Sequence, residues 1–184
     1  DPYGGIVFGT YNEDPDKAKR KPIANLYRLA PNLSLTHLLS NITVSNGIAF
    51  SENENIMYFA DTPTGRIQKF EYTKNFNKFY ELETNMIFKN VGEPDGATVD
   101  IDNNYWSARV RGKCIICVDT KDEKIIEKIS LPTNTPTCVT FGGANLNSLY
   151  ITSLRADPTS DNEGGNLHKI ETSTQGRAQL LADI

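Results

Sequence analysis

The residues best suited to chemistry are an asparagine and an aspartate at equivalent places in two related motifs, Ser45–Phe50 (SNGIAF) and Pro94–Val99 (PDGATV). Asn46 and Asp95 each precede a glycine, and each motif is followed by a cluster of turn residues and an aromatic strand pattern. An amide oxygen and a carboxylate are hard ligands that suit Ca²⁺, Mg²⁺ or Mn²⁺, and a carboxylate also binds Zn²⁺. If the two side chains meet, they predict a site for one divalent metal ion.

The spacing of these motifs indicates a structural repeat. Asp95 follows Asn46 by 49 residues, and Thr137, in a third copy that begins at Pro136, follows Asp95 by 42. Four-stranded propeller blades repeat about every 40 to 50 residues. The first strand of each blade lines the central channel, so we expect Asn46 and Asp95 to converge there. Asn-Gly and Asp-Gly are also common turn dipeptides, and for either dipeptide taken alone that interpretation stays open.

Short strands separated by Gly, Asn, Asp and Pro extend along the whole sequence, which predicts an all-β fold. The expected strands are Ile6–Tyr11, Ala24–Leu29, Leu35–Leu39, Gly47–Phe50, Ile56–Asp61, Arg66–Tyr72, Thr84–Lys89, Ala97–Ile101, Asn104–Arg109, Lys113–Asp119, Ile125–Ser130, Cys138–Phe141, Ser148–Thr152 and Asn166–Glu171. The first of them is expected to be an inner strand. At four strands a blade, residues 1–184 are expected to form one domain, a partial propeller of about four blades.

Composition excludes some partners. The net charge of −4 and the pI near 5.2 argue against nucleic-acid binding, because phosphate neutralisation needs clustered Lys and Arg. No segment approaches the ~20 apolar residues that span a bilayer, so no membrane partner is expected. A hydrophobic content of 38% with 23% charged residues is typical of a soluble globular protein.

The cysteines and histidines have simpler interpretations than a metal or catalytic site. Cys114 and Cys117 match the C-x-x-C spacing, but positions i and i+3 of a strand point to opposite faces, so core packing is expected. With Cys138 the count is odd, which disfavours a disulfide framework; the compartment stays open, with a reduced, cytoplasmic setting favoured. His37 and His168 lie in alternating strand patterns without a nucleophile motif.

Five ordered motifs carry a family resemblance: residues 45–50, 58–67 (YFADTPTGRI), 92–96 (GEPDG), 136–143 (PTCVTFGG) and 149–155 (LYITSLR). The chain resembles the senescence-marker-protein/gluconolactonase/regucalcin family. That resemblance implies a six-bladed β-propeller with one divalent metal ion, acting on a small sugar lactone. Asn46 and Asp95 match two of the family's metal ligands, and Asp95 also matches its proposed general base. Glu13 and Asp14 match a loop that supplies an acidic substrate contact, a role for which they compete.

The sequence also departs from the family pattern. A glutamate metal ligand and an Arg-x-Asn-Asp substrate-binding stretch have no counterpart here, and six blades of ~45 residues need about 270 residues. A second chain, another copy or a further N-terminal part is expected to complete the propeller. The implied chemistry is lactone hydrolysis with the metal as Lewis acid and Asp95 as base. Two alternatives stay open: a non-catalytic metal-binding or interaction propeller, and a hydrolase of another lactone or ester.

Overall fold

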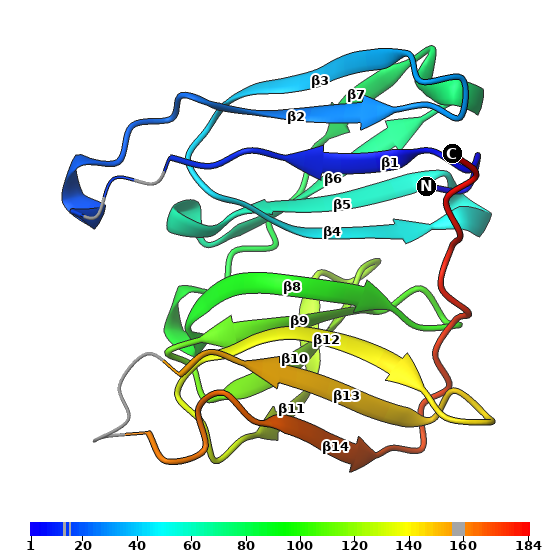
Figure 1. Cartoon of the computed structure of the whole chain (residues 1–184). Helices are drawn as coiled ribbons and strands as arrows, with labels where there is room; N and C mark the ends of the chain where they lie inside the picture. The colour runs from blue at the N-terminus through cyan, green and yellow to red at the C-terminus, as the bar shows by residue number, and fades with distance from the viewer. Residues whose placement is uncertain (13, 15, 156–160) are drawn as a thin grey trace.

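The computed structural model describes residues 1–12, 14, 16–155 and 161–184 as four antiparallel sheets in which consecutive strands are neighbours (Figure 1). The first sheet contains β1 (Ile6–Gly9), β2 (Ala24–Leu29) and β3 (Leu35–Ile42), and the second contains β4 (Ser45–Ser51), β5 (Ile56–Asp61), β6 (Arg66–Tyr72) and β7 (Phe79–Leu82). The third contains β8 (Glu93–Val99), β9 (Tyr105–Val110), β10 (Cys114–Asp119) and β11 (Lys124–Ser130), and the fourth contains β12 (Pro136–Gly142), β13 (Ser148–Ser153) and β14 (Leu167–Glu171). The predicted all-β class is confirmed.

The helices of the described residues are short 3₁₀ turns: η1 (Lys17–Lys19), η2 (Glu52–Glu54), η3 (Thr62–Thr64), η4 (Lys74–Phe76) and η5 (Lys89–Val91). Each has three residues, so they act as connections between strands. None of the helices in the described ranges has the length and apolar character required to cross a membrane.

The first strands of the second, third and fourth sheets lie side by side. β4 packs along β8, and β8 packs against β12. Their arrows point the same way in Figure 1, so the beginnings of these strands lie at one end of the molecule. β1 runs the opposite way: Tyr11 forms an antiparallel bridge with Val44, and the Ser45 hydroxyl donates to the Thr10 carbonyl at 2.9 Å. The strand expected as an inner strand over Ile6–Tyr11 thus lies beside β4 but runs opposite to it, unlike β8 and β12.

The core lies between the sheets in three clusters. β5 shows the principle, since all six of its residues are buried. Met57 and Phe59 pack toward the first sheet, whereas Tyr58 packs toward the third, where Tyr105 lies with its ring centroid 5.2 Å away. A middle strand covered on both faces gives a continuous apolar run in the sequence, and this explains the aromatic pattern after each motif.

One predicted strand is misplaced. The chain forms β7 before the expected segment, and Thr84–Lys89 is a connection that makes a single bridge to β6. Met86 is fully buried in the core between the second and third sheets, and its carbonyl accepts a hydrogen bond from Ile67 at 2.9 Å. Met86 therefore fills the core from a loop, with Phe88 partly buried beside it. Phe79 stacks on Phe70 with centroids 4.7 Å apart, which holds the true edge strand in place.

The expected core packing of Cys114 and Cys117 is confirmed, and both histidines lie on strands as expected. Cys114 and Cys117 are buried on opposite faces of β10, in two different core clusters, and all three cysteines are free. His37 lies on β3, where its Nε2 atom is within hydrogen-bond distance of Asn25 and Ser40. His168 lies on β14.

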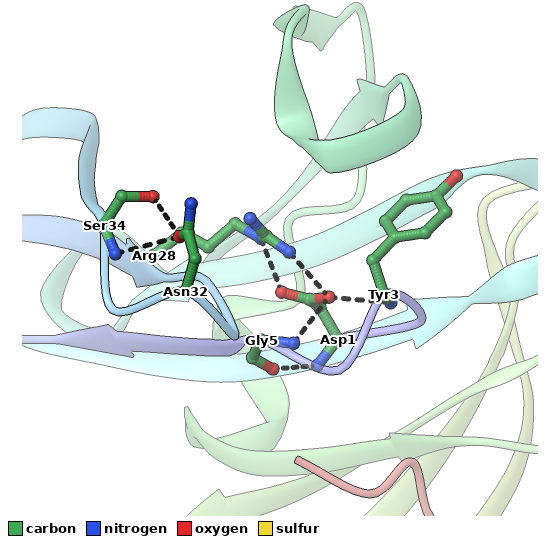
Figure 2. Close-up of polar contacts among 6 residues, drawn as sticks. All are labelled: Asp1, Tyr3, Gly5, Arg28, Asn32 and Ser34. Atoms are coloured by element: carbon green, nitrogen blue, oxygen red, sulfur yellow. Dashed lines mark hydrogen bonds and ion pairs between the residues drawn. The ribbon is translucent and has the colours of Figure 1, made fainter. Parts of the chain in front are cut away.

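A buried ion pair fixes the turn before β1, as Figure 2 shows. Arg28 on β2 donates from Nε to one carboxylate oxygen of Asp1 at 2.6 Å and from Nη2 to the other at 3.2 Å. The same carboxylate accepts the backbone N–H groups of Tyr3 and Gly5. The guanidinium lies 4.8 Å from the centroid of the Phe76 ring, and burial lowers the pKa of Arg28. The charges are compensated by these contacts, as burial requires.

Candidate metal centre

Asn46 and Asp95 lie at β-bulges in the inner strands, at positions that differ by one residue. Asn46 still pairs with Ala60 at the edge of its bulge, whereas Asp95 lies within its bulge, directly after Pro94. The register of β4 against β5 shifts between Asn46 and Ala49, and that of β8 against β9 shifts between Pro94 and Ala97. In each case the pairing advances by three residues along the inner strand but by only two along its neighbour, and this extra residue defines a β-bulge. Both dipeptides lie within strands rather than in turns. Each bulge redirects the side chains beside it, and both candidate ligands lie near the beginnings of neighbouring strands, at the same end of the molecule.

Local structure explains why a glycine follows each candidate ligand. Gly47 has a φ of 63°, in the region that favours glycine, and its carbonyl accepts the hydroxyl of buried Tyr105 at 2.9 Å. Gly96 has no such φ, but a Cβ there would lie 2.8 Å from the carbonyl oxygen of Thr137 and would collide with the Cys138 sulfur. The close approach of β12 therefore requires glycine at Gly96.

The amide of Asn46 is tied to β8 through one hydroxyl group. Asn46 Nδ2 donates to Thr62 Oγ1 at 2.8 Å, and Thr62 Oγ1 donates to the carbonyl of Pro94, also at 2.8 Å. Pro94 directly precedes Asp95. No hydrogen bond of the described residues engages Asn46 Oδ1. The structure thus links the two strands beside the candidate ligands and leaves an amide oxygen available.

Asp95 is partly buried, and its carboxylate makes no ion pair with any described residue. Burial raises the pKa of this carboxyl to about 6, although the backbone N–H of Gly96 acts in the opposite direction. A partly desolvated carboxylate without a neighbouring cation is typical of a functional site.

This donor set fits part of a divalent metal site. An amide oxygen and a carboxylate are the ligands that Ca²⁺, Mg²⁺ and Mn²⁺ prefer. Across the described ranges, no group of three or more His, Cys, Asp or Glu side chains is placed to hold a metal ion. The pair therefore needs further ligands.

A pocket of about 360 Å³ opens beside η3, and it is lined by Ala18, Arg20, Val44, Thr62, Pro63, Glu93 and Arg111. Asn46 and Asp95 do not line it, but Thr62 contacts Asn46 and Glu93 lies two residues before Asp95. Arg111 and Glu93 form an ion pair at 2.6 Å on its rim. The position and the volume suit a small polar ligand.

The acidic loop residues are only partly placed. Glu13 lies outside the described residues. The Asp14 carboxylate accepts the N–H of Asp16 at 2.9 Å, and its carbonyl accepts Nε of Arg20 at 2.9 Å. Asp14 therefore reaches the pocket through Arg20, and no contact joins it to Asn46 or Asp95 within the described ranges.

Sequence reasoning missed Thr62, Arg20 and Arg111. Thr62 lies in a Thr-Pro-Thr-Gly run that indicates a turn. Nothing in that pattern reveals that its hydroxyl reaches a carbonyl 32 residues away. The two arginines belong to loops that only the fold brings together.

Comparison with known proteins finds a match to the SMP-30/gluconolactonase/LRE-like region over residues 1–155. A putative sugar lactone lactonase of Bacillus subtilis is 31% identical over 182 residues, covering 96% of this chain and 61% of the relative. A solved luciferin-regenerating enzyme is 28% identical with a TM-score of 0.86, covering 100% of this chain and 63% of the other. Regucalcin of Agrobacterium tumefaciens, described as a calcium-binding protein, shares the fold with 24% identity and a TM-score of 0.84, covering 100% and 62%. The chain thus spans about three fifths of the length of these proteins.

Proposed function

Because the chain belongs to the SMP-30/gluconolactonase/LRE-like family, we propose that it hydrolyses sugar lactones with the help of one divalent metal ion. The observation that carries this proposal is that Asn46 and Asp95 lie at β-bulges near the beginnings of two neighbouring inner strands. The similarity to a putative sugar lactone lactonase supports the substrate class.

The proposed assembly is a six-bladed propeller to which residues 1–184 contribute about four blades as one domain. The four sheets and the coverage of about three fifths of the relatives support it. The remaining blades, supplied by further sequence or by a second copy, would provide the missing ligands and cover the exposed sheet edges.

Asn46 Oδ1 and the Asp95 carboxylate would hold the ion, which would polarise the lactone carbonyl. Asn46 adds no charge, so the protein contributes a single negative charge from these two residues. A small charge on the ligand set preserves the ability of the ion to withdraw electrons from the substrate.

Asp95 would also act as the general base. Water adds to the carbonyl carbon while a carboxylate oxygen of Asp95 accepts its proton. The ring C–O bond then breaks, and the ring oxygen takes up a proton to give the open hydroxy acid. Burial raises the pKa of Asp95 to about 6 in the metal-free protein, and a bound cation would lower it again. The pocket beside η3 would admit the sugar hydroxyls, with Arg20, Glu93 and Arg111 as hydrogen-bonding partners.

Lactone opening releases acid, so a pH indicator can test the proposal with five- and six-membered aldonolactones. The protein is stripped with a chelator and reloaded separately with Ca²⁺, Mn²⁺ or Zn²⁺. We expect metal-dependent turnover that Asp95→Asn reduces by ~10²–10⁴-fold. Asp119→Asn is the matched control, because Asp119 is on β10 outside the site. Turnover that survives chelation, or survives Asp95→Asn, would refute the mechanism; metal binding without turnover would favour a non-catalytic propeller.

A further inference from the structure

The hydroxyl of Thr62 connects three elements of the candidate metal centre. Thr62 begins η3, directly after β5, and its backbone N–H donates to Val44 just before β4. Its side chain bonds Asn46 on β4 and the Pro94 carbonyl on β8. A residue outside both inner strands therefore contacts each strand beside its candidate ligand.

The direction of these bonds fixes the orientation of the amide. A hydroxyl has one proton, and a backbone carbonyl can only accept. The Thr62 proton is therefore used on Pro94, so the Thr62 oxygen can only accept from Asn46. Asn46 must turn its NH₂ group toward Thr62, and its Oδ1 must point away from it. The oxygen and nitrogen of an amide are otherwise hard to distinguish, and the hydrogen-bond network decides between them.

The turn that carries Thr62 is held independently of that hydroxyl. The Thr64 hydroxyl donates to the Asp61 carbonyl at 2.7 Å and accepts the N–H of Arg66 at 3.1 Å. The Asp61 carboxylate accepts the N–H groups of Thr43 and Val44. The side chain of Thr62 is therefore not needed to close its own turn, and its two bonds serve only the inner strands.

We propose that Thr62 is a positioning residue of the metal centre, which orients Asn46 so that Oδ1, and not the NH₂ group, is presented to the divalent ion. Through Pro94 it also fixes the start of β8 next to Asp95. This inference rests on the proposed function for its metal, although the amide orientation can be measured without one. Thr62 itself contacts neither the ion nor the reacting atoms.

The first test is metal affinity by calorimetric titration with Ca²⁺ or Mn²⁺ alone. Thr62→Val keeps the shape and removes the hydroxyl, and we expect binding to weaken ~10–100-fold, as for other residues that orient metal ligands. Thr62→Ser restores the hydroxyl and should bind within about threefold of the wild type. Thr73→Val is the matched control, because it removes a hydroxyl that accepts the N–H of Lys78 in the turn before η4 and contacts neither Asn46 nor Pro94; its affinity should not change.

The second test needs no metal. Hydrogen exchange of the Asn46 side-chain NH₂, followed by NMR on ¹⁵N-labelled protein, should be slow in the wild type and in Thr73→Val but fast in Thr62→Val. Equal affinity of Thr62→Val and the wild type, or equal weakening by Thr73→Val, would overturn the inference while the proposed function stands. If the wild type binds neither ion, the proposed function fails, and the exchange rates alone decide the orientation: fast exchange in the wild type would overturn it.

Discussion

Replacing Asp95 by Asn should stabilise the metal-free protein while it removes metal binding. Burial raises the pKa of Asp95 from its ordinary value of 3.8 to about 6. The folded state therefore holds this proton more tightly than the unfolded state, and the free energy of unfolding falls as the pH rises from about 4 to about 6. Above pH 6 the full penalty is present. Asn cannot ionise, so the folded variant has no such free-energy penalty at any pH.

The magnitude follows from the pKa difference. A difference of about two in pKa corresponds to about 3 kcal/mol. Since the carboxylate is only partly buried, solvent screening reduces the expected gain of Asp95→Asn to about 1–2 kcal/mol at pH 8. At pH 4 the two proteins should have nearly equal stability. An ion at 100 times its dissociation constant should stabilise the wild type by about 2.7 kcal/mol and leave the variant unchanged.

Urea unfolding at pH 4 and pH 8, with a chelator and then with Mn²⁺, measures each of these differences. Asp119→Asn is the control of opposite sign: the backbone N–H groups of Asp122 and Lys121 lower the pKa of Asp119, so its carboxylate stabilises the fold above about pH 4 and the variant loses stability there. A metal-free Asp95→Asn protein that is no more stable than the wild type at pH 8 would refute the reasoning, as would an equal gain from Mn²⁺ in both.

Other changes test the fold around the site. Arg28→Ala removes the cation that compensates the buried Asp1 carboxylate and should cost about 3–5 kcal/mol in urea unfolding; a loss below about 1 kcal/mol would show that the pair is not a structural anchor. Replacing both Cys114 and Cys117 by Ala should lower stability but leave metal content unchanged by elemental analysis, because the thiols face different cores; loss of metal from a folded double variant would contradict this. Gly47→Ala should destabilise the chain by more than about 1 kcal/mol in the same unfolding assay, because its φ is positive, and an unchanged midpoint would argue against a strained bulge.

The repeat was predictable because its signals are local. The apolar runs of β5 and β9, and the dipeptides Asn46-Gly47 and Asp95-Gly96, have the same order in each copy. The segment Thr84–Lys89 misled the prediction because its apolar run Met86–Phe88 is typical of a strand, although Met86 fills a gap between two sheets from a loop. Local sequence does not determine which part of the fold an apolar residue packs against.

Long-range polar contacts were beyond prediction for the same reason. Arg28 and Arg109 alternate with apolar residues in their strands, which is typical of a solvent-facing charge, yet both are buried. Arg109 donates to the carbonyls of Phe88 and Gly92 in the loop before β8. The role of Thr62 likewise depends on Pro94, which only the packing of η3 against β8 brings near.

The position of a bound ion tests the central claim most directly. A crystal soaked in Mn²⁺ and measured with anomalous scattering locates the metal without reference to activity. We expect one peak within about 2.0–2.6 Å of Asn46 Oδ1 and of an Asp95 carboxylate oxygen. A peak elsewhere, or oxygens of these two side chains more than ~7 Å apart, which no single ion could bridge, would contradict it.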